Sequence, residues 1–313
     1  MCTKKTSSDV YQIVTDHIIR QLEQGIIPWK RPWRSLGTPR NFLTKKPYRG
    51  INLLLLGMNE YATPDYLTYK QAQQLGGHIK KGAKSQIVVF WQMRYYVAGN
   101  PDETAKSWKN LTQQQTPPQG SKIVPLLRYY RVFNLEDTEG IDYTVPEMPE
   151  PTQDLSIDEL AQAMLPVQSL TGLTIVSGGN RACYSPPQDT IYMPSIHHFH
   201  STSAYVDTLY HELSHSTGHQ NRLARIGITE AVNNRSERYA KEELIAELGS
   251  CFLMHHYGYG RKELLDNSVA YLQSWLGRLR NDKKLIVEAA AGAQKAVDYI
   301  LDQVEEQPAV VPT

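Results

Sequence analysis

The chain has few cysteines, no long apolar run and almost no net charge. Its three cysteines, Cys2, Cys183 and Cys251, stand far apart, which argues against a disulfide framework and predicts reduced thiols. No stretch approaches the roughly 18 consecutive apolar residues of a membrane span. The first residues also lack the apolar core of a signal peptide. The sequence therefore predicts a cytoplasmic protein with no membrane partner.

The net charge of +1 hides a strong asymmetry within the 313 residues. Residues 1–135 hold 20 Lys and Arg against 7 Asp and Glu, a net charge of +13, whereas the remainder carries −12. A basic segment of this size predicts contact with a polyanion, although a solvated basic surface would carry the same charge. The length is sufficient for two domains of roughly 100–200 residues each.

The first 135 residues predict an α+β domain. Apolar residues at helical spacing and β-branched or aromatic runs predict helices at 9–25, from 53 and from 68, and strands at 87–97 and 123–133. Asp9 and Thr68 are the expected helix caps, and Gly25 the expected stop. Residues 98–121 are rich in Gln, Pro and Thr, which is typical of a mobile insertion.

An acidic, proline-rich stretch at 136–156 predicts a linker between two domains. Beyond it, short strands are expected at 173–176, 182–184 and 190–193, and helices at 203–217, 237–257, 262–280 and 283–304. We therefore predict an α+β protein whose second domain, 157–304, is mostly helical with a small sheet. Residues 305–313 are expected to form a disordered tail.

The pattern His-Glu-x-x-His at His211, Glu212 and His215 is the strongest chemical signal. On a helix, imidazoles at i and i+4 project from one face and can hold one cation, for which we predict Zn²⁺. Glu212 can take a proton from a water molecule whose pKa the metal lowers. The composition alone would produce this pattern about 0.02 times. The sequence therefore predicts a metallopeptidase-type site with Glu212 as general base.

A catalytic zinc site usually has a third protein ligand. The metzincin pattern needs a histidine where this chain has Asn221, and His219 lies roughly 6 Å farther along the helix axis. In the next long helix, Glu243 and Glu247 share a face. We favour Glu243 as the ligand and Glu247 as the hydrogen-bond acceptor of a ligand histidine, with the swapped assignment open. Glu242 is expected to face solvent.

Other residues near this pattern have candidate roles. The strand at 190–193 is expected to be an edge along which an extended peptide lies. Tyr192 and Tyr239 are candidate donors to a developing oxyanion, although a tyrosine more often serves in packing. Arg222 and Arg225 are expected to form structural salt bridges.

Basic and aromatic residues alternate in the N-terminal part. The candidate DNA contacts are Trp29, Lys30, Arg31, Trp33, Arg34, Arg49, Lys80, Lys81 and Lys84. Rings that stack on bases, set among cations that neutralise phosphates, are typical of sequence-tolerant binding to single-stranded DNA. For Trp29 and Trp33, packing in the core is an equal alternative. No helix-turn-helix, zinc-finger or RNP motif is visible.

Together these motifs resemble those of ArdC-type antirestriction proteins. Residues 10–95 carry Gly25-x-x-Pro28-Trp29, Pro32-Trp33, Tyr48-Arg49-Gly50-Ile51-Asn52, Thr68-x-x-Gln71-Ala72 and Gly76-Gly77-x-x-x-Lys81-Gly82. The second half carries Tyr184-Ser185-Pro186, Asp189-x-Ile191, the run from His211 to His219, and Glu242-Glu243-x-x-Ala246-Glu247-Leu248. The resemblance covers nearly the whole chain apart from residues 98–121, the linker and the tail.

The resemblance implies a single-stranded DNA-binding domain joined to a zincin-like metallopeptidase domain. Such proteins are carried by conjugative plasmids or related mobile elements and protect incoming DNA from host restriction. The resemblance extends to the N-terminal part of plasmid primases that travel with transferred DNA. His211, Glu212 and His215 carry over from the family motif, and Glu243 carries over as the third ligand.

Two main functions remain open at this point. In the first, the chain is a zinc peptidase, tethered to single-stranded DNA, that cleaves an unidentified protein or peptide such as a component of the host restriction machinery. In the second, the chain coats DNA and its zinc domain is structural or catalytically silent. A toxin-like peptidase delivered with DNA is a third, weaker idea.

Overall fold

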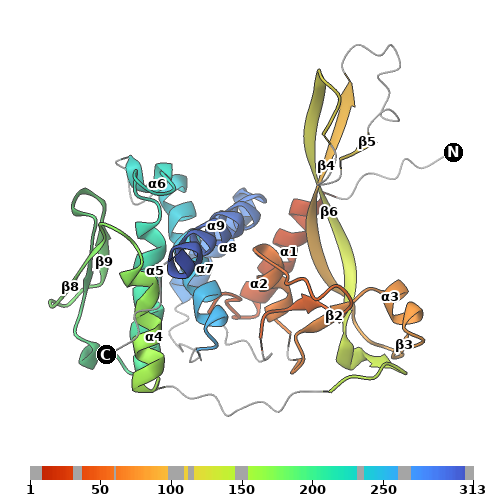
Figure 1. Cartoon of the computed structure of the whole chain (residues 1–313), viewed down its shortest axis with the longest axis horizontal. Helices are drawn as coiled ribbons and strands as arrows, with labels where there is room; N and C mark the ends of the chain where they lie inside the picture. Colours follow the sequence, from red (N-terminus) through yellow and green to blue (C-terminus); the bar gives the residue numbers. More distant parts are fainter. Residues whose placement is uncertain are drawn as a thin grey trace.

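A computed structural model describes residues 9–30, 37–59, 61–97, 109–111, 116–144, 154–230, 236–259 and 269–306. Figure 1 shows a long two-stranded ribbon on one side, a central group of helices and a small sheet on the other side. The fold is mixed α and β, and the second half is mostly helical, as predicted. Among the described residues, no helix combines the length and apolarity needed to span a bilayer.

The N-terminal half contains a five-stranded sheet of order β1-β2-β6-β4-β5. Its strands are β1 (Arg40–Asn41), β2 (Asp65–Leu67), β4 (Gln86–Val97), β5 (Lys109–Asn110) and β6 (Ser121–Asn134). The antiparallel pair β4 and β6 forms the long ribbon and confirms both predicted strands. Residues 109–110 pair with β4, so this part of the predicted mobile insertion belongs to the sheet.

Three helices of the N-terminal half confirm the predicted ones. They are α1 (Val10–Glu23), α2 (Ile51–Gly57) and α3 (Tyr69–Gln74). Asp9 accepts hydrogen bonds from the first turn of α1, and Gly25 adopts a positive φ of 79° just beyond its end. Thr68 and Gln71 form a capping box at the start of α3.

The chain continues to contact the N-terminal half beyond the predicted domain boundary at residue 135. The short helix η1 (Leu135–Asp137) and strand β7 (Thr138–Glu139) follow β6 directly, and β7 pairs with β3 (His78–Ile79). Residues 136–139 therefore belong to the N-terminal half. The prolines of the expected linker, Pro146, Pro149 and Pro151, and residues 307–313 of the expected tail lie outside the described residues.

The second half consists of helices with a three-stranded sheet at their outer side (Figure 1). The helices are α4 (Ile157–Gln168), α5 (Thr202–Ser216), α6 (Ile226–Thr229), α7 (Glu237–His256), α8 (Val269–Asn281) and α9 (Leu285–Glu306), with the short η2 (Pro186–Gln188) and η3 (Ile196–His198). Helix α4 was not predicted from the sequence, although Ser156 and Glu159 form a capping box that marks its start.

The predicted edge strand proves to be central. In the order β8-β10-β9, strand β10 (Thr190–Met193) lies between β8 (Thr174–Ser177) and β9 (Cys183–Ser185). Both of its edges are paired, parallel to β8 and antiparallel to β9. Among the described residues, the edges that have no strand partner are those of β8 and β9 and not those of β10.

The two halves share one hydrophobic core. Helix α1 packs against α8 and α9, and α2 packs against α9. The same apolar cluster includes Ile18 and Leu54 from the first half and Leu244 and Ile286 from the second, all buried. Neither half therefore buries its helices by itself.

Trp29 is part of this shared core and not of a DNA-binding surface. Its side chain is fully buried, its ring centroid lies 5.7 Å from that of Trp275, and its Nε1–H donates to the Tyr271 hydroxyl at 3.3 Å. The prediction that Trp29 stacks on a DNA base is therefore wrong. The neighbouring Lys30 places its ammonium 4.3 Å from the centroid of the Tyr271 ring. Arg31, Trp33 and Arg34 lie outside the described residues.

We predict that Trp29→Ala lowers the free energy of unfolding by about 3–5 kcal/mol, because it empties the contact between the two halves. Urea denaturation followed by circular dichroism measures this change. Tyr69→Ala, at a side chain that is 53% exposed, is the matched control and should change stability by less than about 0.5 kcal/mol. Equal stability of the two variants would contradict the shared core.

Candidate metal centre

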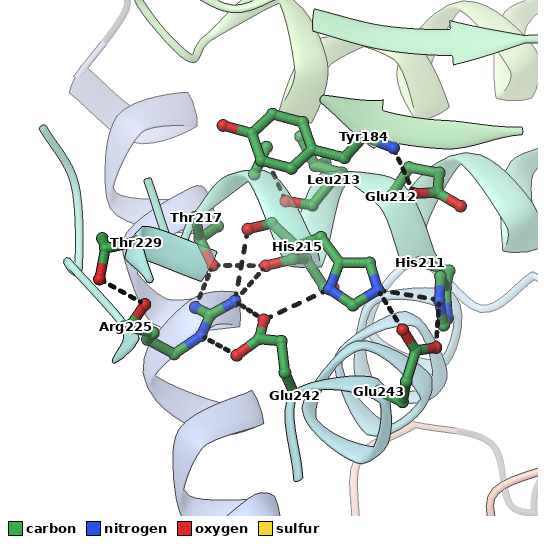
Figure 2. Close-up of polar contacts among 12 residues, drawn as sticks. Tyr184, His211, Glu212, Leu213, His215, Thr217, Arg225, Thr229, Glu242 and Glu243 are labelled. Carbon is green, nitrogen blue, oxygen red and sulfur yellow. Dashed lines mark hydrogen bonds and ion pairs between the residues drawn. The ribbon is translucent and has the colours of Figure 1, made fainter. Parts of the chain in front are cut away.

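Helices α5 and α7 bring His211, His215 and Glu243 together. One ligand atom from each of these side chains lies within 4.8 Å of the other two. The two Nε2 atoms of the histidines are 3.2 Å apart, and oxygens of Glu243 lie 3.7 Å from His211 Nε2 and 3.6 Å from His215 Nε2. Figure 2 shows the three side chains converging from the two helices.

These distances fit a single divalent cation. Two atoms that each lie about 2.1 Å from one tetrahedral ion are about 3.4 Å apart. The distance between the two histidine nitrogens, 3.2 Å, and those from each nitrogen to its nearer Glu243 oxygen, 3.7 Å to Oε2 and 3.6 Å to Oε1, lie close to that value. Two imidazoles and one carboxylate, with a coordination position left open, are also a ligand set of catalytic zinc sites. His211, His215 and Glu243 would therefore hold the metal.

The charges of these side chains support each other before any cation binds. Burial by itself would lower the pKa of His211, but the hydrogen bond to Glu243 and the nearby carboxylates raise it to about 8. Burial would raise the pKa of Glu243, but His211 and His215 lower it to about 2. The carboxylate is thus ionised at neutral pH, which is the form that a cation requires.

Glu212 lies beside the three ligand residues and is held by strand β9. Its Oε2 accepts a hydrogen bond from the backbone N–H of Tyr184 at 2.8 Å, and only 8% of the residue is exposed (Figure 2). One carboxylate oxygen is therefore fixed by the backbone.

Glu242 was expected to face solvent, but the structure buries it beside His215. It is only 4% exposed, and its Oε1 lies 3.3 Å from His215 Nδ1. Burial raises its pKa, but His215 and Arg225 outweigh burial and lower it. Glu242, and not Glu247, is thus the carboxylate that contacts a ligand histidine. The solvent-facing expectation failed because α7 is buried on several sides, including the one that carries Glu242.

Glu247 acts at a longer range. Its Oε1 accepts a hydrogen bond from the Tyr271 hydroxyl at 2.9 Å. Its negative charge is among the causes that raise the pKa of His211. Glu247 therefore contributes charge to the centre and connects it to α8.

Two arginines after α5 form the predicted salt bridges. Arg225 donates to both oxygens of Glu242, at 2.9 and 2.6 Å, and to the carbonyl of Ser214 at 2.8 Å. Arg222 donates to both oxygens of Asp189, at 2.8 and 2.7 Å. Since the Tyr184 hydroxyl also donates to Asp189 at 2.8 Å, Arg222 ties strand β9 to the end of α5. Both ion pairs therefore fix elements that contact Glu212 or His215.

Gly249 lets α7 approach α5 closely. A Cβ atom at this position would lie 2.4 Å from Ser214 Oγ and 2.9 Å from Ser214 Cβ. Ser214 is fully buried and precedes His215 directly. The absence of a side chain at Gly249 therefore sets the distance between the helix of the histidines and the helix of Glu243.

Of the remaining candidate residues of this half, Tyr239 contacts the metal centre, whereas the hydrogen bonds of Tyr192 and His219 go elsewhere. The hydroxyl of Tyr239 shares a hydrogen bond with Glu243, and burial together with this bond raises the pKa of Tyr239 to about 12. Tyr192 instead donates to Gln188 at 3.0 Å. His219 accepts from the backbone N–H of Asn221 at 3.3 Å and is not among the residues that converge on the cation position.

The predicted DNA contacts of the N-terminal half differ in their surroundings. Arg49 pairs with Asp298 of α9, and Lys80 donates to the carbonyl of Glu136 at 2.7 Å. Lys81 and Lys84 are exposed at the turn between β3 and β4. These residues remain candidate phosphate contacts.

Comparisons with known proteins match both halves of the chain. Residues 8–133 match the N-terminal domain of anti-restriction factor ArdC, and residues 162–292 match a zincin-like metallopeptidase. Two crystal structures of the antirestriction protein ArdC from plasmid R388 are 34% identical and cover 96% of this chain. The metal-free structure has a TM-score of 0.72 and is covered to 99%; the Mn(II)-bound one has 0.70 and is covered completely, at 100%.

Curated relatives agree with this picture. The uncharacterized protein y4eC of Sinorhizobium fredii is 32% identical over 308 residues, which cover 95% of this chain and 93% of y4eC. Two proteins of Escherichia coli, both named DNA primase TraC, are 33% identical over 307 and 300 residues, or 95% and 93% of this chain. The chain spans only 28% and 20% of the length of these two primases.

We predict that Glu242→Gln weakens Zn²⁺ binding by about 10-fold to 100-fold, because the amide no longer favours the ligand orientation of His215. Competition with a chromophoric zinc chelator measures the affinity. Glu237→Gln, at an exposed residue of the same helix, should leave it unchanged. An unaltered affinity in Glu242→Gln would mean that this carboxylate serves only the ion pair with Arg225.

We predict opposite effects for alanine at two helical glycines. Gly249→Ala should destabilise the fold by about 1–3 kcal/mol and weaken Zn²⁺ binding, because the methyl group forces α5 away from α7. Gly277→Ala in α8 has open space around its Cβ and should stabilise the fold by about 0.5–1 kcal/mol. Urea denaturation and zinc titration of both variants test this pair, and a stable Gly249→Ala with normal affinity would refute it.

Proposed function

The chain belongs to the ArdC family of antirestriction proteins, and from that premise we propose that it protects incoming DNA from host restriction. In this proposal the N-terminal half binds single-stranded DNA, and the metal centre hydrolyses a peptide bond of an unidentified protein. The observation that carries the catalytic part is the spacing of His211, His215 and Glu243 around one cation position, with Glu212 beside them.

The charge distribution supports binding to DNA. The net charge of +13 over residues 1–135 favours a polyanion, and the binding should weaken as salt rises because counterions are released. The opposite charge of the remaining residues disfavours DNA near the metal centre. A protein substrate, and not the nucleic acid, is therefore the proposed ligand of that centre.

The donor set supports zinc as the resident metal. Two imidazole nitrogens and one carboxylate oxygen suit its intermediate softness and its tetrahedral geometry. When bound, the cation lowers the pKa of a coordinated water molecule and polarises the scissile carbonyl.

The residues around this position have different roles in the proposed hydrolysis. The Tyr184 N–H holds one oxygen of Glu212, so the other oxygen can accept a proton from the attacking water and pass it to the leaving amine. The pKa of Tyr239, raised to about 12, keeps its hydroxyl protonated at neutral pH. Tyr239 can therefore donate a hydrogen bond to the oxygen on which negative charge develops.

We predict that Glu212→Gln retains Zn²⁺ but loses hydrolysis by a factor of about 100 to 10,000, because the amide cannot accept the proton. Cleavage of a mixed library of fluorescence-quenched peptides by the zinc-loaded protein measures the activity, and zinc titration checks the metal. Glu237→Gln is the control and should cleave as the wild type does. Wild-type cleavage by Glu212→Gln would defeat the assignment of the general base.

A DNA-coating protein with a silent metal domain is the second candidate. The shared hydrophobic core favours it, since the helices of the metal domain cover α1 and α2 of the DNA-binding half and support its fold. Transfer of DNA into a restricting recipient distinguishes the two functions. Peptidase action requires that Glu212→Gln loses protection, whereas coating alone requires that the variant protects as the wild type does.

A further inference from the structure

A hollow of about 790 Å³ lies on the N-terminal sheet, away from the metal centre. Its wall includes Phe90 of β4 and Tyr130 of β6, together with Tyr48 and Lys46 from the segment between β1 and α2. The hollow, called the aromatic groove below, is therefore lined by the long ribbon and by the start of α3. Figure 1 shows where this ribbon joins the rest of the sheet.

Three exposed aromatic residues line the groove, and one of them, Trp91, packs edge-on against Tyr11 of α1. The other two, Phe90 and Tyr130, are the candidates for stacking. Phe90 is 46% exposed and Tyr130 is 45% exposed. Their ring centroids are 5.7 Å apart, and the buried Tyr48 supports Phe90 at 6.1 Å. Both rings point to one face of the sheet, because Tyr130 pairs with Val88 and Phe90 lies two residues farther along the same strand. They form a fixed apolar platform in contact with water.

The polar residues of the groove fit a negatively charged ligand with flat, hydrogen-bonding rings. Lys46 lines the groove, no carboxylate does so among the described residues, and the exposed Arg128 pairs with Phe90 across the ribbon. Gln92 is also in the wall, and its buried Oε1 has no hydrogen-bond partner in the part of the chain that the structure describes. A small rotation of this amide would offer both a donor and an acceptor to the edge of a base.

We propose that the aromatic groove binds unstacked bases of single-stranded DNA, with Phe90 and Tyr130 stacking on the bases and Lys46 and Arg128 contacting phosphates. The identity of the ligand rests on the proposed function. A duplex cannot use the groove, because its bases already stack and pair with each other. The groove takes the role that the sequence assigned to Trp29, which the shared core makes inaccessible.

The test uses the full chain and a fluorescein-labelled oligothymidylate, with affinity measured by fluorescence anisotropy. Phe90→Ala and Tyr130→Ala should each weaken binding by about 5-fold to 150-fold, the range expected for loss of one stacked base. Tyr69→Ala removes an equally exposed ring of the same half that does not line the groove, and it should bind as the wild type does. Thermal melting checks that the variants fold.

An abasic strand of the same length separates stacking from phosphate contacts. The wild type should prefer oligothymidylate to the abasic strand, and Phe90→Ala/Tyr130→Ala should lose that preference while keeping its affinity for the abasic strand. Arg128→Gln should instead weaken the binding of both strands by the same factor. It should also lower the number of ions released on binding, measured from the salt dependence of the affinity, by about one. Equal preference in the wild type and the double variant would overturn the assignment of the groove.

The outcomes also distinguish this proposal from the proposed function. If the wild type binds single-stranded DNA and the aromatic variants bind it equally well, the assignment of the groove as the binding site is wrong. The proposal that the chain binds single-stranded DNA is then retained. If the wild type binds no single-stranded DNA, both fail. A single-stranded RNA and a duplex of equal length complete the set: tighter binding of either one than of oligothymidylate would overturn the choice of single-stranded DNA.

Discussion

The close contact between α5 and α7 is the constraint on which the metal centre depends. Two ligands lie on one helix and the third on the other, so an error of about 1 Å in their distance would separate the ligand atoms beyond the reach of one ion. Gly249 permits the approach, because no larger residue leaves room for Ser214. The helices thus act as rigid supports that hold the three side chains before the cation arrives.

The buried charges of Arg225 and Glu242 stabilise the packing of α5 against α7 only when all of their partners are present. Removing an ion from water costs several kcal/mol, which the attraction of a single partner rarely offsets. Arg225 has more than one partner, because it donates to Glu242, to Thr217 and to the carbonyl of Ser214 at once. Together these hydrogen bonds offset the cost of its burial. Glu242 in turn contacts His215, so the ion pair and the ligand form one network. Fold stability and metal affinity are therefore coupled at this position.

The two halves carry different surfaces on one core. The helices that support the metal centre also cover α1 and α2, and Trp29 and Tyr271 join them by a hydrogen bond. Tyr271 donates in turn to Glu247, four residues beyond Glu243. Meanwhile the ribbon of β4 and β6 packs Val89 and Leu127 into the core and carries the exposed rings of Phe90 and Tyr130 on its surface. A single folded unit can thus present DNA-binding and metal-binding surfaces in a fixed relation.

The sequence by itself determined the local features: the helices with their caps, the long strands, and the pair His211 and His215, because each of these depends on residues a few positions apart. It also placed Glu243 and Glu247 on one face and favoured Glu243 as the ligand, but it did not reveal that Glu242 is buried. Only the tertiary structure decided that Glu242 is buried against Arg225, that Trp29 lies in the core, and that β10 is central. These properties depend on which distant elements pack together, and burial by a distant helix leaves no periodic signal in the local sequence.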